Sequence, residues 1–256
     1  MMKILITNDD GVESEGIWAL ARSVVNLGKV TIVAPKYNKS GTSGSITFIK
    51  SLEVEKQKNR IKGVECFSVE GTPADSVIIG LKEICKNPTI VLSGINNGYN
   101  LSRNIMISGT IGAAMIANTQ GKKSIAFSSE SFESIHNHHL EMMINRIVKE
   151  CISENIPNET FLNINFPNVK NEKIGHAIET TPENSNLSIT TDQVSKNEYK
   201  ILLSQLQSQK SNNLKDKTDM KTVKNGLVSI TLLNGNNFSQ HKSKNTMKRI
   251  LKAANI

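Results

Sequence analysis

KILITNDDG, residues 3–11 of the chain, places two adjacent acids directly after a short apolar run. The run at 4–6 is typical of a buried strand, and Gly11 tolerates the sharp backbone conformations that end one. In a continuing strand, neighbouring side chains point to opposite faces, so Asp9 and Asp10 converge only if the chain turns there. The stretch therefore predicts a buried strand that ends in an acidic turn.

The adjacent acids have two interpretations. Two carboxylates a few ångström apart repel each other, and the usual remedies are a shared proton or a bound cation. We interpret Asp9 and Asp10 as a cation site. The alternative is a plain strand-to-helix turn, because Asp and Gly are common turn formers.

Strands and helices alternate along the first two thirds of the chain. This alternation predicts an α/β fold with a doubly wound, mostly parallel, Rossmann-like sheet whose site lies at the carboxyl ends of the strands. Thr72, Pro73 and Asp75 predict a capped helix start, with Thr72 as N-cap. Further strands are expected at 30–34, 46–54, 66–69, 89–93, 124–128, 161–166 and 228–233, and helices at 15–27, 72–86, 109–119 and 138–154.

The chain divides into three parts by composition. Residues 1–168 carry the alternating pattern and are expected to form the α/β catalytic core. Residues 169–227 are rich in Lys, Asn, Ser and Gln, which indicates an extended hairpin, an oligomerisation segment or disorder. Residues 228–256 are expected to return one strand to the sheet and then form a C-terminal arm, with a short helix at about 239–254.

Polar loops follow the first, second and fifth apolar strands. They carry Asn8 to Gly11, the segment 38–44 with Ser40, and the segment 93–100 with Asn96. Strand ends of a parallel sheet share one edge, so these loops are expected to meet. Their oxygen donors suit magnesium, manganese or calcium rather than zinc.

The tripeptide Ser108-Gly109-Thr110 stands at the start of a predicted helix. Hydroxyls and free backbone N–H groups at such a position favour a phosphate, and Gly109 allows close approach. A metal site and an oxyanion pocket on one edge indicate phosphate-ester chemistry.

Composition argues against several other classes. The net charge is +8, but the lysines are scattered and aromatic residues make up only 4%, so specific nucleic-acid binding is not expected. Neither a signal peptide nor an apolar run of about 18–20 residues occurs, which indicates a cytoplasmic protein without membrane contact. The three cysteines, Cys66, Cys85 and Cys151, lack paired spacing and are interpreted as buried thiols.

Five motifs, in order, carry a family resemblance. ILITNDDG (4–11), APKYNKSG (34–41), GTPAD (71–75), SGINNGYN (93–100) and SGTIGAA (108–114) closely resemble the SurE family of metal-dependent 5'-nucleotidases. TDMKTVKNGLVSIT (218–231) is similar to the same family's C-terminal strand region. Two stretches depart from the family: Ile107 replaces a usual Tyr or His, and 176–186 lacks the family's arginines.

The resemblance implies a site and an activity. It implies Asp9, Asp10, Ser40 and Asn96 as ligands of one divalent cation per subunit, Mg²⁺ or Mn²⁺. It implies Asn8, Ser108, Gly109 and Thr110 near the bound phosphate. The implied reaction converts nucleoside monophosphates to nucleoside and phosphate, with 3'-monophosphates and polyphosphate as further substrates, in a homodimer or homotetramer that exchanges a C-terminal arm.

The expected mechanism uses a water activated by the cation, with Asp9 or Asp10 as the catalytic group that orients or deprotonates it. One alternative is a phosphatase that forms an aspartyl-phosphate. That chemistry normally uses two acids two residues apart, whereas Asp9 and Asp10 are adjacent. A rival of another class is a nucleotide-sensing or RNA-binding module with a degenerate metal site.

Overall fold

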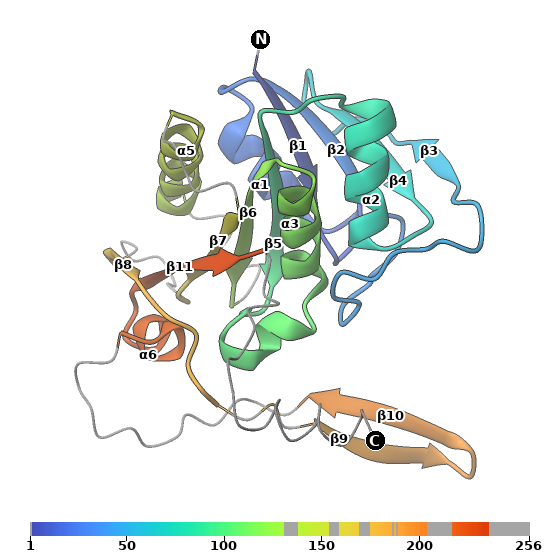
Figure 1. The fold of residues 1–256 in the computed structure, drawn as a ribbon, viewed down its shortest axis with the longest axis vertical. Coiled ribbons are helices and arrows are strands. Elements are labelled where there is room, and N and C mark those ends of the chain that lie inside the picture. Colours follow the sequence, from blue (N-terminus) through green and yellow to red (C-terminus); the bar gives the residue numbers. More distant parts are fainter. Residues whose placement is uncertain are drawn as a thin grey trace, which may run out of the picture.

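The computed structural model describes residues 2–130, 138–153, 159–168, 175–185, 187, 189–203 and 217–235. A nine-stranded sheet with the order β3-β4-β2-β1-β5-β6-β7-β11-β8 runs through the molecule (Figure 1). The strands from β4 through β2, β1, β5 and β6 to β7 are parallel. Toward the two edges, β3 (Val54–Lys56) and β11 (Val228–Asn234) pair antiparallel with β4 and β7, and the edge strand β8 (Ala177–Glu179) pairs parallel with β11.

The sheet strands of the first 168 residues are β1 (Lys3–Thr7), β2 (Lys29–Pro35), β3 (Val54–Lys56), β4 (Glu65–Val69), β5 (Ile90–Asn97), β6 (Lys123–Ser129) and β7 (Thr160–Phe166). Strand β1 lies in the middle, and Ile4, Leu5 and Ile6 are completely buried. Burial on both faces explains why this strand is a continuous apolar run rather than an alternating one.

Helices cover both faces of the sheet (Figure 1). On one face, α1 (Glu15–Val24) and α5 (His138–Ser153) contribute to one large apolar cluster. On the other face, α2 (Pro73–Ile79) and α3 (Gly109–Thr119) pack against Leu5, Val33 and Val91. The predicted doubly wound α/β architecture is confirmed.

The predicted helix cap at Thr72 is also confirmed. Its side chain accepts from the N–H of Asp75, while the Asp75 carboxylate accepts from the N–H of Thr72, and Pro73 occupies the first helical position. Helix α2 then continues as a π-helical turn at Gly80–Ile84.

The strand predicted at 46–54 is wrong except at its end, where β3 begins at Val54. The Thr47 N–H and hydroxyl donate to the two Asp75 carboxylate oxygens at 2.9 and 2.8 Å, instead of joining a ladder. Phe48 and Ile49 are exposed. The alternating residue types at 46–53 therefore do not form a strand, because the Thr47 N–H bonds to a side chain and not to a neighbouring strand.

Strand β5 is longer than predicted, because it continues past Ser93 to Asn97. Gly94 makes this possible: its φ is +127°, and a Cβ there would lie 2.3 Å from the carbonyl oxygen of Phe127. The register with β6 shifts between Ser93 and Asn96 and then resumes. Asn96 is thus held by a strand end rather than by a free loop.

The C-terminal part contains more regular structure than predicted. Its elements are β8 (Ala177–Glu179), β9 (Ile189–Ser195), β10 (Glu198–Leu203), the short helix α6 (Asp219–Lys224) and β11 (Val228–Asn234). Strands β9 and β10 pair with each other, and among the described strands with no other, so they form an extended hairpin, as expected for this segment (Figure 1). The helix predicted at 239–254 lies outside the described residues.

Two other expectations concern the core and the membrane. Cys66, Cys85 and Cys151 are buried free thiols, as predicted, and burial raises the pKa of Cys66 to about 12. No helix in the described ranges is long and apolar enough to cross a bilayer.

Candidate active site

The loops after β1, β2 and β5 meet at one edge of the sheet, as predicted. Because β2, β1 and β5 are parallel neighbours, their carboxyl ends lie side by side. Hydrogen bonds join these segments: the Lys39 N–H donates to the Asp9 carbonyl at 2.7 Å, and the N–H of Asn97, the last residue of β5, donates to the Asp10 carboxylate at 3.2 Å. The two acids therefore stand between the other two loops.

The turn at Asn8 to Gly11 is fixed by local hydrogen bonds. The Asn8 Nδ2 donates to the Gly11 carbonyl at 2.9 Å, and Gly11 has φ +100°. A Cβ at Gly11 would lie 3.2 Å from the Tyr37 carbonyl carbon. Glycine therefore fits this position both because of the positive φ and because of the close backbone of Tyr37. Asn8 is fully buried and its Oδ1 has no partner among the described residues.

Asp9 is held by the start of helix α3. Its Oδ1 accepts from the Thr110 hydroxyl at 2.5 Å, and its carboxylate also accepts from the backbone N–H groups of Gly109 and Thr110. Only 3% of Asp9 is exposed. Burial raises the pKa of Asp9, although these hydrogen bonds act in the opposite direction.

Asp10 is less buried than Asp9, but its pKa is also raised. Burial, and then the charge of Asp9, raise the pKa of Asp10 to about 6, against the lowering effect of the Asn97 N–H. Both acids thus carry an electrostatic cost in the charged form. A divalent cation between them would remove that cost.

A cavity of about 620 Å³ opens over this edge of the sheet. Of the predicted site residues, it is lined by Asp9, Ser40, Asn96 and Ser108. Asn96 uses its Nδ2 to donate to the Gly98 carbonyl at 2.8 Å, which leaves its side-chain oxygen as the group that can face a ligand. Asn8, Asp10, Gly109 and Thr110 are not among the lining residues; Thr110 contacts Asp9, and Asp10 is partly exposed beside Asn97.

The donor set fits a hard divalent cation. Two carboxylates, a hydroxyl and an amide oxygen are the ligands that magnesium and manganese prefer. Nowhere in the described ranges do three His, Cys, Asp or Glu side chains gather, so the chain offers no zinc-type cluster there. The Oδ1 of Asn8, the residue before Asp9, is buried without a hydrogen-bond partner among the described residues, which makes it a further oxygen acceptor in the same turn.

Ser108 is the N-cap of α3, and its hydroxyl accepts from the Ile111 N–H at 3.2 Å. It lines the cavity at the positive end of the helix, where an anion is favoured. The N–H groups of Gly109 and Thr110 are turned to Asp9 instead. Their predicted phosphate contact stays a prediction, whereas the Thr110 hydroxyl has a defined role in holding Asp9.

We expect Thr110→Val to weaken the site without distorting the helix. Valine has nearly the same shape but cannot donate to the buried Asp9 carboxylate, and a lost hydrogen bond to a charged group costs on the order of 2 kcal/mol. Denaturant unfolding should therefore show a lower stability. Thr119→Val, at the exposed far end of α3, is the control and should change little. Equal stability of the two variants would contradict the role given to Thr110.

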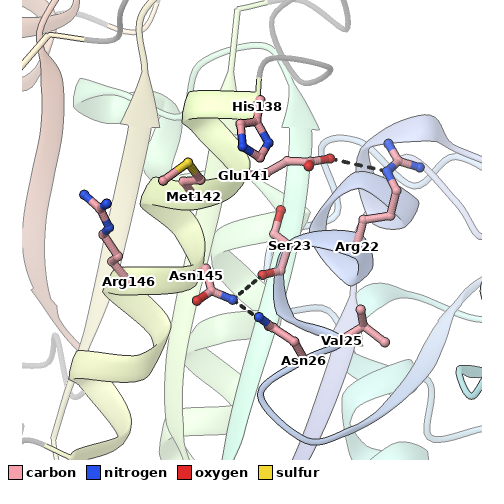
Figure 2. Close-up of a pocket in the computed structure, with 9 residues that line it drawn as sticks. All are labelled: Arg22, Ser23, Val25, Asn26, His138, Glu141, Met142, Asn145 and Arg146. Carbon is pink, nitrogen blue, oxygen red and sulfur yellow. Dashed lines mark hydrogen bonds and ion pairs between the residues drawn. The ribbon is translucent and has the colours of Figure 1, made fainter.

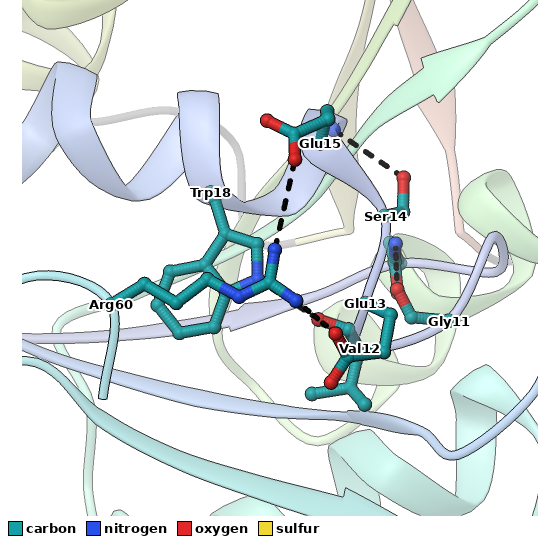
Figure 3. Close-up of polar contacts among 9 residues, drawn as sticks. Gly11, Val12, Glu13, Ser14, Glu15, Trp18 and Arg60 are labelled. Atoms are coloured by element: carbon teal, nitrogen blue, oxygen red, sulfur yellow. Dashed lines mark hydrogen bonds and ion pairs between the residues drawn. The ribbon is translucent and has the colours of Figure 1, made fainter. Parts of the chain in front are cut away.

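A second group of residues supports the acidic turn from outside (Figure 3). The Arg60 guanidinium lies 5.1 Å from the centre of the Trp18 ring and pairs with the carboxylates of Glu13 and Glu15. Trp18 in turn donates from Nε1 to the Val12 carbonyl at 3.0 Å. Sequence reasoning missed Arg60, because nothing in the segment around it marks a partner so far away in the chain.

A buried polar network supports the loop after β5. The Asn100 N–H donates to Asn165 Oδ1 at 2.9 Å, and Asn163 Nδ2 donates to the Asn100 carbonyl at 2.8 Å. Farther along, the Ser102 N–H donates to the Asp219 carboxylate at 2.7 Å. These asparagines on β7 and the acid on α6 were also missed. The two asparagines stand as polar residues within an apolar strand, and Asp219 lies within the motif at 218–231, but neither pattern shows that these residues meet the loop after β5.

A second hollow, of about 360 Å³, lies between α1 and α5 (Figure 2). Arg22 and Glu141 pair across it at 3.4 Å, and Asn145 Nδ2 donates to the Ser23 carbonyl and to Asn26 Oδ1, both at 2.7 Å. These polar groups satisfy one another and join the two helices. The hollow holds no acidic pair, so the cavity beside Asp9 is the candidate active site.

Known proteins share both the sequence and the fold. The family model described as Survival protein SurE matches residues 4–188. The 5'-nucleotidase SurE of Dehalococcoides mccartyi (strain 195) is 35% identical over 244 residues, which cover 93% of this chain and 91% of that protein. The 5'-nucleotidase SurE of Aquifex aeolicus is 42% identical over 176 residues, 68% of each chain. A crystal structure of the SurE protein from Aquifex aeolicus matches 97% of this chain and 99% of its own, with a TM-score of 0.78 and 33% identity.

Proposed function

The chain belongs to the survival protein SurE family, and on that basis we propose that it is a metal-dependent phosphatase of nucleoside 5'-monophosphates. The products are a nucleoside and phosphate. The observation that carries the proposal is the pair Asp9–Asp10: Asp9 is buried, Asp10 is partly buried, and the charge of Asp9 raises the pKa of Asp10. Asp9 lines a cavity that also presents Ser40, Asn96 and Ser108.

Asp9, Asp10, Ser40 and Asn96 would hold one Mg²⁺ or Mn²⁺. Such an ion, when bound, neutralises charge on the phosphoryl group and makes water more acidic. Magnesium and manganese suit the all-oxygen donor set equally well, so both are proposed.

The protein's own groups position the reaction. Asp9 is fixed by three donors of α3 and serves to orient, whereas Asp10 is held by one N–H and is the better candidate to accept a proton from the attacking water. Water gives a proton to Asp10 as it adds to phosphorus, and the bond between phosphorus and the nucleoside oxygen breaks. That oxygen takes up a proton from solvent, and Asp10 then releases to solvent the proton that it accepted. Ser108, at the N-terminus of α3, donates to a phosphoryl oxygen, and the helix dipole favours its charge.

The wider substrate range and the assembly are also proposals. Like the nucleoside 5'-monophosphates, 3'-monophosphates and polyphosphate present a phosphoryl group to the same acids. A homodimer or homotetramer is supported by the exposed apolar residues Val194 and Tyr199 on the β9–β10 hairpin.

Removal of the metal should abolish the activity. We expect phosphate release from nucleoside 5'-monophosphates with Mg²⁺ or Mn²⁺, no release after treatment with a chelator, and recovery when the metal is added back. A colorimetric phosphate assay on the purified chain measures all three. Full activity in excess chelator would contradict the metal site, and tight RNA binding without phosphate release would favour a nucleotide-sensing or RNA-binding module instead.

A further inference from the structure

We propose that the β9–β10 hairpin forms an apolar wall for the nucleobase, so that Ile189, Ile201 and Leu203 give the site its preference for nucleotides over other phosphate esters. This inference rests on the proposed function, since it assigns the far end of the same cavity. The residues lie about 180 positions or more along the chain from Asp9 and Asp10, and none of the family motifs described above includes them.

The strand pairing places the three side chains on one face of the hairpin. Leu203 is paired with Ile189, and Ile201 lies two residues before Leu203 on the same strand. Side chains two apart, and those directly opposite, share a face of a two-stranded ribbon. All three line the cavity that also contains Asp9, Ser40, Asn96 and Ser108.

These aliphatic side chains are unusually exposed. Ile189, Ile201 and Leu203 are 52%, 73% and 47% exposed, although they belong to the most apolar residue types. A contiguous exposed apolar group beside a polar cavity is typical of a ligand-binding wall. The cavity therefore has a polar end that suits a phosphate and an apolar end.

A nucleoside monophosphate has the same two-ended character. Its phosphate is charged, and its base presents a flat face that can be buried against aliphatic groups. The three side chains cannot form hydrogen bonds, so they contact every base in the same way. The wall should thus separate nucleotides from base-free sugar phosphates, yet discriminate little among the bases.

The test compares adenosine 5'-monophosphate with ribose 5-phosphate, which lacks the base. We expect the unaltered protein to show a KM for ribose 5-phosphate about tenfold higher, as burial of part of the base face predicts. The double variant Ile201→Ser/Leu203→Ser should raise the KM for adenosine 5'-monophosphate by about tenfold, with kcat unchanged and the KM for ribose 5-phosphate unchanged. Leu202→Ser is the matched control, because its side chain lies on the opposite face of the same strand.

Each other outcome would overturn the inference. Equal KM values for both substrates in the unaltered protein would show that the base is not contacted, while leaving the phosphatase proposal intact. An equal change for both substrates, together with a smaller mass by light scattering, would assign the hairpin face to contacts with a second copy of the chain. No phosphate release from either substrate would overturn the function and the inference together.

Discussion

Asp10→Asn should reduce phosphate release from a nucleoside 5'-monophosphate by about 10²- to 10⁴-fold, the usual contribution of a positioned acid or base. Asparagine keeps the shape of the side chain and one oxygen that can accept from the Asn97 N–H. It removes one of the two charges that would bind a divalent cation, and it cannot take a proton from water. Steady-state rates at saturating Mg²⁺ or Mn²⁺ measure the loss.

The same variant should leave the metal-free fold at least as stable as before. The charges of Asp9 and Asp10 oppose each other, and the Asp9 charge contributes to the raised pKa of Asp10. Removal of one charge relieves this repulsion. In thermal unfolding, the unaltered protein should gain stability from added metal, because a ligand that binds only the folded state stabilises it, and Asp10→Asn should lose most of that gain.

Glu13→Gln is the matched control for Asp10→Asn. It neutralises an acid in the segment just after the same turn, but Glu13 faces Arg60 on the outer side (Figure 3). Activity and the stabilisation by metal should fall much less than in Asp10→Asn, because this variant weakens only one of the contacts of Arg60 on the outer side of the turn. If Asp10→Asn behaved like Glu13→Gln in both measurements, the assignment of the acidic pair would be wrong.

Gly109→Ala should damage the site although it improves helix propensity. A Cβ at Gly109 would lie 2.8 Å from the Asp9 Cβ, 2.9 Å from Asp9 Oδ2 and 3.1 Å from Thr42 Oγ1. Asp9 cannot move aside without losing the donors that fix it. We expect a loss of activity of roughly a hundredfold and a lower stability by on the order of 1–3 kcal/mol, as for other overpacked sites.

Propensity alone predicts the opposite result for Gly109→Ala. Within a helix, alanine is more favourable than glycine by about 1 kcal/mol. Denaturant unfolding and the phosphate assay therefore separate the two effects. Thr119→Ala introduces alanine at the exposed end of the same helix and should leave activity unchanged. A Gly109→Ala protein that is more stable and fully active would show that Asp9 does not pack against this helix.

Local sequence was sufficient for most of the core. Buried parallel strands must be apolar on both faces, and helix starts need side-chain caps, so β1, β2 and the start of α2 were readable from short segments. The prediction failed at 46–54, where Thr47 bonds to Asp75 instead of to a strand. It also placed the end of β5 too early, because the register shift past Ser93 depends on the contact of Gly94 with β6.

In the candidate active site, too, some features follow from local sequence and others depend on tertiary contacts. The sequence by itself determined that the segments with Asp9, Ser40 and Asn96 meet, because parallel strands bring their carboxyl ends to one edge whatever the details of packing. Only the tertiary structure decided that Thr110 faces Asp9, that Arg60 supports the turn over Trp18, and that a hairpin more than ninety residues beyond Asn96 lines the cavity. Those contacts join distant segments through side-chain shape and burial, which no local pattern of residue types encodes.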